Sequence, residues 1–89
     1  MGKASKQNRW RKHNQTNPYK EPTALLKKGM KSDGVKWLQY ELNQAGYKLT
    51  IDGDFGSGTE SAVKQFQKAN KLTVDGIVGS ATRSMLKSK

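Results

Sequence analysis

The 89-residue chain contains no cysteine, only two prolines and no long apolar run. Without cysteine there can be no disulfide framework, thiolate metal site or cysteine nucleophile. A membrane-spanning helix needs about 18 apolar residues in succession. The basic residues at the start are not followed by the apolar segment of an export signal. We therefore expect one small domain held together by packing, with no metal and no cofactor.

Acidic residues are scarce, but the shortage is uneven along the chain. The whole sequence has 17 Lys and Arg against seven Asp and Glu, a net charge of +10. Residues 1–31 hold nine of the basic residues and only Glu21, a balance of +8, whereas residues 32–89 hold eight against six, a balance of +2. The basic character therefore belongs mainly to the N-terminal part.

The N-terminal part also has too few apolar residues to form a core. Residues 1–23 are polar and basic, with Trp10 and Tyr19 as nearly the only apolar side chains. Such a composition cannot bury enough surface to offset chain entropy. We predict a basic polar linker or arm over residues 1–23 and a globular domain over residues 24–89, with Leu25 and Leu26 able to dock onto its core.

Three amphipathic segments predict an all-α fold, a small three-helix bundle. The first spans about 33–45, with an N-cap oxygen from Ser32 or Asp33 and with Gly46 at its end. The second spans 57–70 and opens on Ser57 to Glu60, which fits an S-x-x-E capping box. The third begins near Ser80. Their apolar stripes follow helical spacing: Val35, Leu38, Leu42 and Ala45; Ala62, Val63, Phe66 and Ala69; Ala81, Met85 and Leu86.

An internal repeat with an offset of 23 residues is the most informative feature of the sequence. Residues 52–63, DGDFGSGTESAV, align with residues 75–86, DGIVGSATRSML, and six of the twelve positions are identical. Each copy contains an Asp-Gly-x-x-Gly turn followed by a helix start. The sequence therefore predicts that one structural unit is used twice.

Each repeated turn can be interpreted physically. Asp52 and Asp75 are expected to accept hydrogen bonds from backbone amides of their own turns, and Phe55 and Val78 are expected to enter the core. Positive φ or close backbone approach is expected at the glycines of the two turns, which are Gly53, Gly56, Gly76 and Gly79.

The residues that could carry catalysis or bind a metal do not form a convincing set. The D-x-D-x-G run of Asp52 to Gly56 lacks the glycine and glutamate that a calcium loop needs at its sixth and twelfth positions. His13 is the only histidine, without partners for a zinc site or a triad. Paired carboxylates for glycoside hydrolysis could be drawn from Glu41, Asp54 and Glu60, but so small a domain offers little cleft. We expect no enzymatic activity.

The ordered motifs of residues 25–87 resemble the peptidoglycan-binding-domain-1 family. The resemblance is carried by Gly34-Val35, Leu38-Gln39, Leu42 and Gly46, then Asp52 to Gly56 with Thr59, then Ala62-Val63 and Phe66-Gln67, and finally Asp75-Gly76, Val78-Gly79, Thr82 and Leu86. No single element is diagnostic, whereas the ordered set with its repeat is specific.

This resemblance implies non-catalytic binding of bacterial cell-wall peptidoglycan. It also implies that an attached amidase, peptidase or muramidase, such as an endolysin or autolysin, is carried to its substrate in the cell wall or outside the cell. Peptidoglycan, as glycan and stem peptide, is the expected partner, and the chain is expected to act as a monomer. The basic arm could add attraction to anionic wall polymers.

Seven side chains are candidates for the ligand site: Trp37, Tyr40, Tyr47, Asp54, Lys64, Gln65 and Arg83. The three aromatic residues could line a shallow groove in which sugar faces and peptide methyl groups stack. Alternatively, Trp37 and Tyr40 cover the edge of the core or cradle the arm. Arg83, Lys64 and Gln65 could reach carboxylates or amides of a stem peptide.

Two other functions compete with wall binding. A small basic helical protein could bind nucleic acid, but such proteins carry their basic residues on a recognition helix, and here the excess lies in the arm. A protein–protein adaptor domain is the other alternative.

Overall fold

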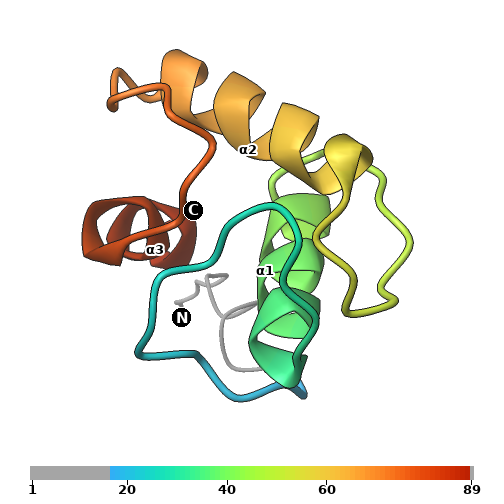
Figure 1. Ribbon diagram of the computed structural model, residues 1–89. Helices are drawn as coiled ribbons and strands as arrows, with labels where there is room; N and C mark the ends of the chain where they lie inside the picture. Colours follow the sequence, from blue (N-terminus) through green and yellow to red (C-terminus); the bar gives the residue numbers. More distant parts are fainter. Residues whose placement is uncertain (1–16, 89) are drawn as a thin grey trace, which may run out of the picture.

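The computed structural model describes residues 17–88 and contains three α-helices in that range, as predicted (Figure 1). Helix α1 spans Asp33–Gln44, α2 spans Ser57–Ala69 and α3 spans Ser80–Lys87. Within residues 17–88 the only extended pairings are two isolated bridges, Leu26 with Val78 and Lys31 with Asp54. The helix α1 packs against both α2 and α3.

The ends of α1 follow the predicted signals. The Ser32 side chain caps the helix by accepting a hydrogen bond from the Val35 amide at 3.3 Å. After the last turn, Gly46 adopts a φ of +107°, a left-handed conformation that glycine enters without the steric cost of a side chain. The backbone amide of Tyr47 then bonds back to the Leu42 carbonyl at 3.0 Å.

The predicted capping box of α2 is wrong. The N-cap is Gly56, which has no side chain to offer, and Ser57 is already the first helical residue. The helix begins one residue before the position that an S-x-x-E box needs, so Ser57 and Glu60 cannot cap each other. Gly56 itself has a φ of −98° with open space beside it, so neither reason expected for a glycine applies there.

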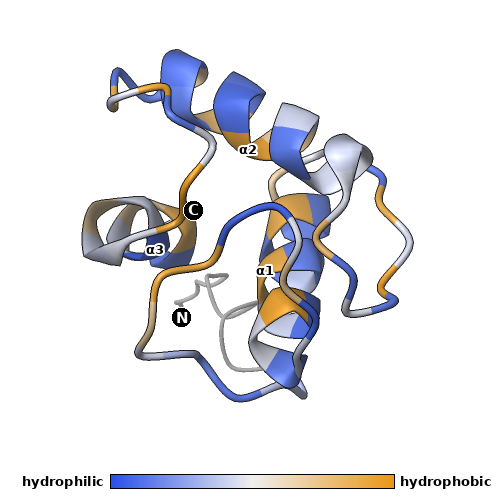
Figure 2. Cartoon of the chain, in the orientation of Figure 1, coloured by the Kyte–Doolittle hydropathy of each residue, from blue (hydrophilic) through white to orange (hydrophobic). Residues whose placement is uncertain are grey.

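The core lies where the three helices and the two turns meet. In Figure 2, α2 turns its apolar side toward the rest of the molecule and its polar side outward. Phe55 and Val78 are fully buried, as the repeat predicted. The buried apolar residues are Leu26, Val35, Trp37, Leu38, Leu42, Phe55, Ala62, Val63, Phe66, Val78 and Leu86.

None of the helices within residues 17–88 is long and apolar enough to cross a membrane.

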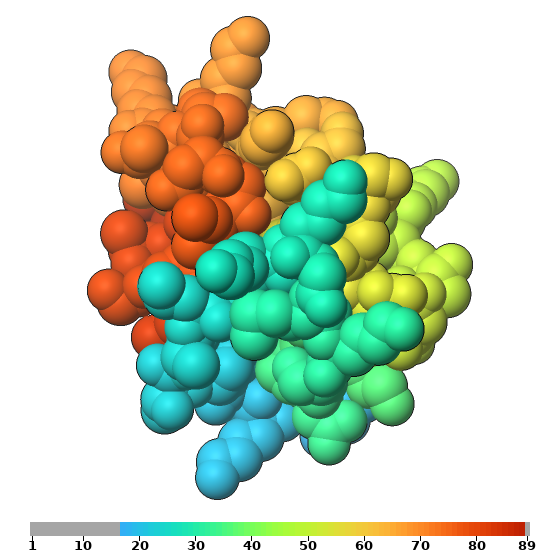
Figure 3. All heavy atoms as spheres, viewed as in Figure 1, coloured from blue at the N-terminus to red at the C-terminus, as the bar shows by residue number. Residues whose placement is uncertain are grey.

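Residues 24–32, here called the strap, pair with both repeated turns and contain a tight turn at Lys28-Gly29. Leu26 and Val78 exchange two backbone hydrogen bonds of 3.1 and 2.8 Å. Further along, the Phe55 amide bonds to the Met30 carbonyl at 2.9 Å, and the Ser32 amide bonds to the Gly53 carbonyl at 3.0 Å. Figure 3 shows the strap between orange atoms of the second turn and yellow atoms of the first. The strap therefore fixes the two turns relative to each other.

Residues 17–23 belong to the predicted arm and contact two helices. Asn17 donates to the Glu41 carboxylate at 2.7 Å, and the ring of Tyr19 meets that of Tyr40 edge to face, with centroids 6.3 Å apart. Glu21 forms an ion pair with Lys87 at 3.2 Å. The rest of the arm, with Trp10 and His13, lies outside the described residues, and the boundary at residue 24 stays a prediction.

The neighbouring leucines of the strap provide a test of its role. Leu26 is 1% exposed and Leu25 is 59% exposed. Because Leu26→Ala leaves a cavity between the second turn and the core, we expect it to lower the free energy of unfolding by about 2–5 kcal/mol. Leu25→Ala should change it by about 0.5 kcal/mol or less. Urea denaturation followed by circular dichroism measures both, and equal effects would show that the strap does not anchor the core.

Candidate functional site

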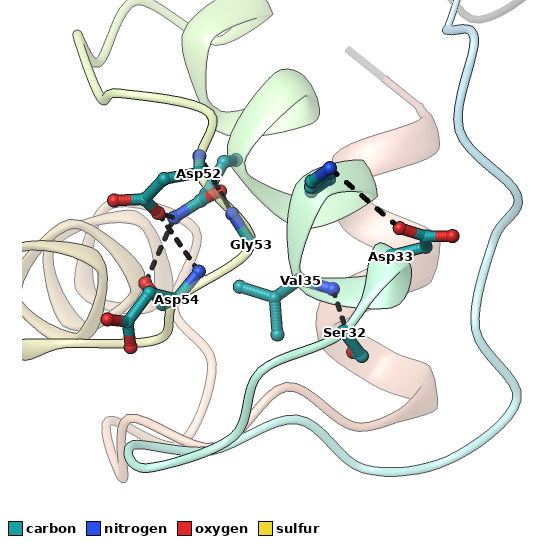
Figure 4. Close-up of polar contacts among 8 residues, drawn as sticks. Ser32, Asp33, Val35, Asp52, Gly53 and Asp54 are labelled. Atoms are coloured by element: carbon teal, nitrogen blue, oxygen red, sulfur yellow. Dashed lines mark hydrogen bonds and ion pairs between the residues drawn. The ribbon is translucent and has the colours of Figure 1, made fainter.

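The first repeated turn is held by a buried glutamine of α1. The Gln39 side chain, 1% exposed, accepts hydrogen bonds from the amides of Asp52 and Gly53 at 3.1 and 2.9 Å. Its NH₂ group donates to the Asp52 carboxylate, the Asp54 carbonyl and the Thr59 hydroxyl at 3.0–3.1 Å. Figure 4 shows this turn beside α1, with the capped helix start nearby. One side chain therefore fixes both the turn and the start of α2.

The second turn is held in the same way by a glutamine of α2. Gln67, also 1% exposed, accepts from the amides of Asp75 and Gly76 at 3.2 and 3.0 Å. It donates to the Asp75 carboxylate, the Ile77 carbonyl and the Thr82 hydroxyl at 2.9–3.3 Å. Every bond of the first network has its counterpart here. The structural repeat therefore includes the helix before each turn as well as the turn.

The structural role of these two glutamines was not predicted from the sequence. The signal was present as V-K-x-L-Q at residues 35–39 and V-K-x-F-Q at residues 63–67, an offset of 28. The turns themselves are offset by 23, so five extra residues separate glutamine and turn in the first copy. A search at a single offset finds the turns and leaves out the side chains that hold them.

The turns also confirm the roles predicted for the two aspartates and for Gly53 and Gly76. Asp52 accepts from the Asp54 amide at 2.9 Å, and Asp75 accepts from the Ile77 amide at 3.0 Å. These backbone bonds favour the ionised carboxylates and hold the pKa of each below its ordinary value, with a further contribution from the glutamine amide. Gly53 and Gly76 have φ values of +76° and +74°.

A shallow cavity of about 250 Å³ opens beside the first turn. Its wall combines carboxylate and hydroxyl groups with backbone that carries no side chain. Asp54 and Thr50 are exposed there, whereas Thr59 is 5% exposed. The cavity can therefore present several hydrogen-bond acceptors to a ligand that carries hydroxyl or amide donors. It is lined by Gln39, Leu49, Thr50, Asp52, Asp54, Gly56, Gly58 and Thr59.

The three predicted aromatic site residues lie in different surroundings. Trp37 is 4% exposed and belongs to the core. Tyr40 is half-buried against Tyr19. Tyr47 is half-buried and lines a separate cavity of about 450 Å³ with Phe66 and Asn70. That cavity is lined by Tyr47 without Trp37 or Tyr40. The contact of Tyr40 with Tyr19 is the kind expected if an aromatic residue cradles the arm.

The four predicted polar site residues are also distributed over the molecule. Asp54 lines the cavity of the first turn. Lys64 and Gln65 are exposed on α2, where Lys64 crosses the second turn and Gln65 donates to Ser61 at 3.3 Å. Arg83 forms an ion pair with Glu21 at 3.5 Å and donates to the Ala24 carbonyl. The assignment of all seven residues to one site stays a prediction.

Within residues 17–88 there is no group of three or more His, Asp or Glu side chains that could hold a metal ion. The three carboxylates considered for glycoside hydrolysis lie in different surroundings. Glu41 is buried against Asn17, and Asp54 faces the first cavity. Glu60 has its side chain over Gly76 of the second turn.

Comparison with known proteins places these features in a wider group. A family model described as a peptidoglycan binding domain matches residues 31–86, which include both glutamines and both turns. A curated relative, the type VI secretion system spike protein VgrG3 of Vibrio cholerae, is 43% identical over 53 residues. That match covers 56% of this chain but only 5% of the relative.

Solved structures share the fold. A peptidoglycan-binding protein from Clostridioides difficile, in complex with glutamine hydroxamate, is 43% identical with a TM-score of 0.71, over 73% of this chain and 41% of that one. The N-terminal domain of SleB is 34% identical with a TM-score of 0.74, over 78% and 96% of the two chains. A Burkholderia AP3 phage endolysin is 41% identical with a TM-score of 0.70, over 72% and 25%.

The structural role of the buried glutamines can be tested by comparing two glutamines of α2, one buried and one exposed. Gln67→Ala removes the partners of two turn amides and a carbonyl, so we expect the free energy of unfolding to fall by about 3 kcal/mol. Gln65→Ala, two residues away and exposed, should cost about 0.5 kcal/mol or less. Chemical denaturation compares them, and similar midpoints would contradict the role given to Gln67.

The lowered pKa values of Asp52 and Asp75 predict acid sensitivity. A carboxylate with a lowered pKa in the folded state stabilises the fold above its ordinary pKa, and this stability is lost as the pH falls through the lowered value. The melting temperature should therefore drop progressively below about pH 4. The double variant Asp52→Asn, Asp75→Asn should melt lower at neutral pH and show a flatter acid slope in a thermal scan. An unchanged slope would assign acid sensitivity to other groups.

Proposed function

Because the chain belongs to the peptidoglycan binding domain family, a family of non-catalytic cell-wall-binding modules, we propose that it tethers an attached wall hydrolase to its substrate. A weakly binding module on a flexible connection raises the effective concentration of its partner at an insoluble polymer. The proposal of a hydrolase partner is supported by the similarity to a phage endolysin, of which this chain covers 25%. Domains of this kind act at the cell wall.

The cavity beside the first turn is the proposed peptidoglycan site. It is the place where exposed acceptors, Asp54 and Thr50, stand next to a turn whose geometry is fixed by Gln39. Rigid placement lowers the entropy that a ligand must lose on binding. Hydroxyl and amide donors of the glycan and its attached peptide match these acceptors. The observation that carries the assignment is the fixed turn with an acceptor-rich cavity at its side.

The proposal also covers the role of the basic arm and the number of chains in the working unit. The arm adds attraction to anionic wall polymers, which salt should weaken because it screens charge beyond about 10 Å at 0.1 M. A single chain holds the whole first cavity, so a monomer is the proposed working unit.

A sedimentation assay tests the site. The full chain is mixed with purified cell-wall sacculi that have been stripped of anionic polymers, in about 0.5 M salt to suppress charge attraction. The native chain should pellet with the sacculi. The variant Thr50→Ala, Asp54→Ala should bind about tenfold more weakly, because two acceptor contacts are lost.

The matched control changes two exposed residues of α2, Ser61→Ala and Gln65→Ala, and should pellet like the native chain. Loss of binding in the control but not in the cavity variant would move the site to α2. A native chain that stays in solution would overturn the proposed function itself.

A further inference from the structure

A second cavity, of about 440 Å³, lies beside the second turn. Six of its eight lining residues stand 23 positions after a residue that lines the first cavity: Thr73, Asp75, Ile77, Gly79, Ala81 and Thr82. The glutamine network behind it matches the first one bond for bond. The two cavities are therefore copies of one structural unit.

The lining of the second cavity is more apolar than that of the first. Ile77 occupies the position of Asp54, Ala81 occupies that of Gly58, and Leu25 of the strap closes one side. Leu25 and Val74 are the two large hydrophobic residues that stay exposed within residues 17–88, at 59% and 48%. Val74 stands between two lining residues in the chain. Of the two exposed residues, Leu25 lines the cavity, so an exposed apolar side chain is available there to an apolar group of a ligand.

We propose that the second cavity is a stem-peptide subsite, which binds the alanine methyl groups of the same polymer. This inference rests on the proposed function and adds a second contact to it. The cavity has no aromatic side chain that could stack on a sugar ring, whereas Leu25, Ile77 and Ala81 offer aliphatic contact. Short aliphatic groups are what such a lining accommodates.

Lys64 and Glu60 lie over the second turn, on the side of Gly76. The Lys64 side chain crosses the turn so closely that a Cβ on Gly76 would lie 3.1 Å from the Lys64 Cε. The same Cβ would lie 3.2 Å from the Glu60 Cγ, so Lys64 and Glu60 pass over the turn together, and neither of them lines the second cavity. The proposed match therefore rests on the aliphatic lining, which suits a short peptide rich in alanine.

The strap sets the spacing between the two subsites. It pairs with the second turn at Leu26 and with the first turn at Lys31. Five residues of backbone reach at most about 18 Å, which bounds the distance between these two pairings. One polymer occupies both cavities when its neighbouring groups match their spacing. The second contact then becomes intramolecular and strengthens binding to the wall without a second module.

The subsite can be tested by nuclear magnetic resonance on the isotope-labelled full chain. The probes are a free alanine-containing stem peptide and a peptidoglycan disaccharide without peptide. The stem peptide should shift the amide signals of residues 73–82 and Leu25, and the disaccharide should not. Ile77→Asp, which installs the residue of the first cavity, should weaken this peptide binding about tenfold. Leu25→Asn, at an exposed position, provides a second variant if Ile77→Asp unfolds.

The reciprocal variant Asp54→Ile is the control, and it should leave the peptide shifts at residues 73–82 unchanged. Shifts at residues 73–82 caused by the disaccharide, or none caused by the peptide, would overturn the stem-peptide subsite. If the native chain still pellets with sacculi in that case, the proposed function stands without this subsite. Failure to pellet would overturn the proposed function instead.

Discussion

The fold depends on two buried glutamine side chains, each of which satisfies the backbone of a turn. A polar group in the core is costly unless its hydrogen bonds are made, and Gln39 and Gln67 make theirs entirely with turn backbone, aspartate and threonine. Each glutamine thereby ties one helix to the start of the next. With no cysteine in the chain, these networks carry a cross-linking role that disulfides perform in many small domains.

The helices could be predicted from the sequence to within about one residue, because their apolar spacing and end signals are local. The core roles of Phe55 and Val78 were also predictable from the repeat. The glutamines were not recognised, because polar residues are usually exposed and their partners lie 8 and 13 residues away. The prediction of a capping box at the start of α2 was wrong for a related reason. The Thr59 hydroxyl accepts a hydrogen bond from Gln39, and this distant contact helps to fix where α2 begins.

The candidate site was less predictable than the fold. Trp37 lies off the Val35 and Leu38 stripe, yet it is buried, because α1 packs on more than one side. Whether such a residue is buried depends on segments that are distant in the sequence. Asn17 and Tyr19, for example, contact α1. Helical spacing alone therefore cannot separate an exposed aromatic residue from a buried one. Of the seven predicted site residues, Asp54 is among the lining of the first cavity, and its assignment to the ligand site stays a prediction.

The two units differ in the length of chain between glutamine and turn, 13 residues in the first and eight in the second. In the longer connection both ends are fixed, and the residues after α1, 45–51, form no helix and supply Leu49 and Thr50 to the cavity wall. Insertions or substitutions there would reshape the cavity without disturbing the buried networks. Related modules can thus diversify in ligand preference through this one loop, while the shorter copy preserves the scaffold.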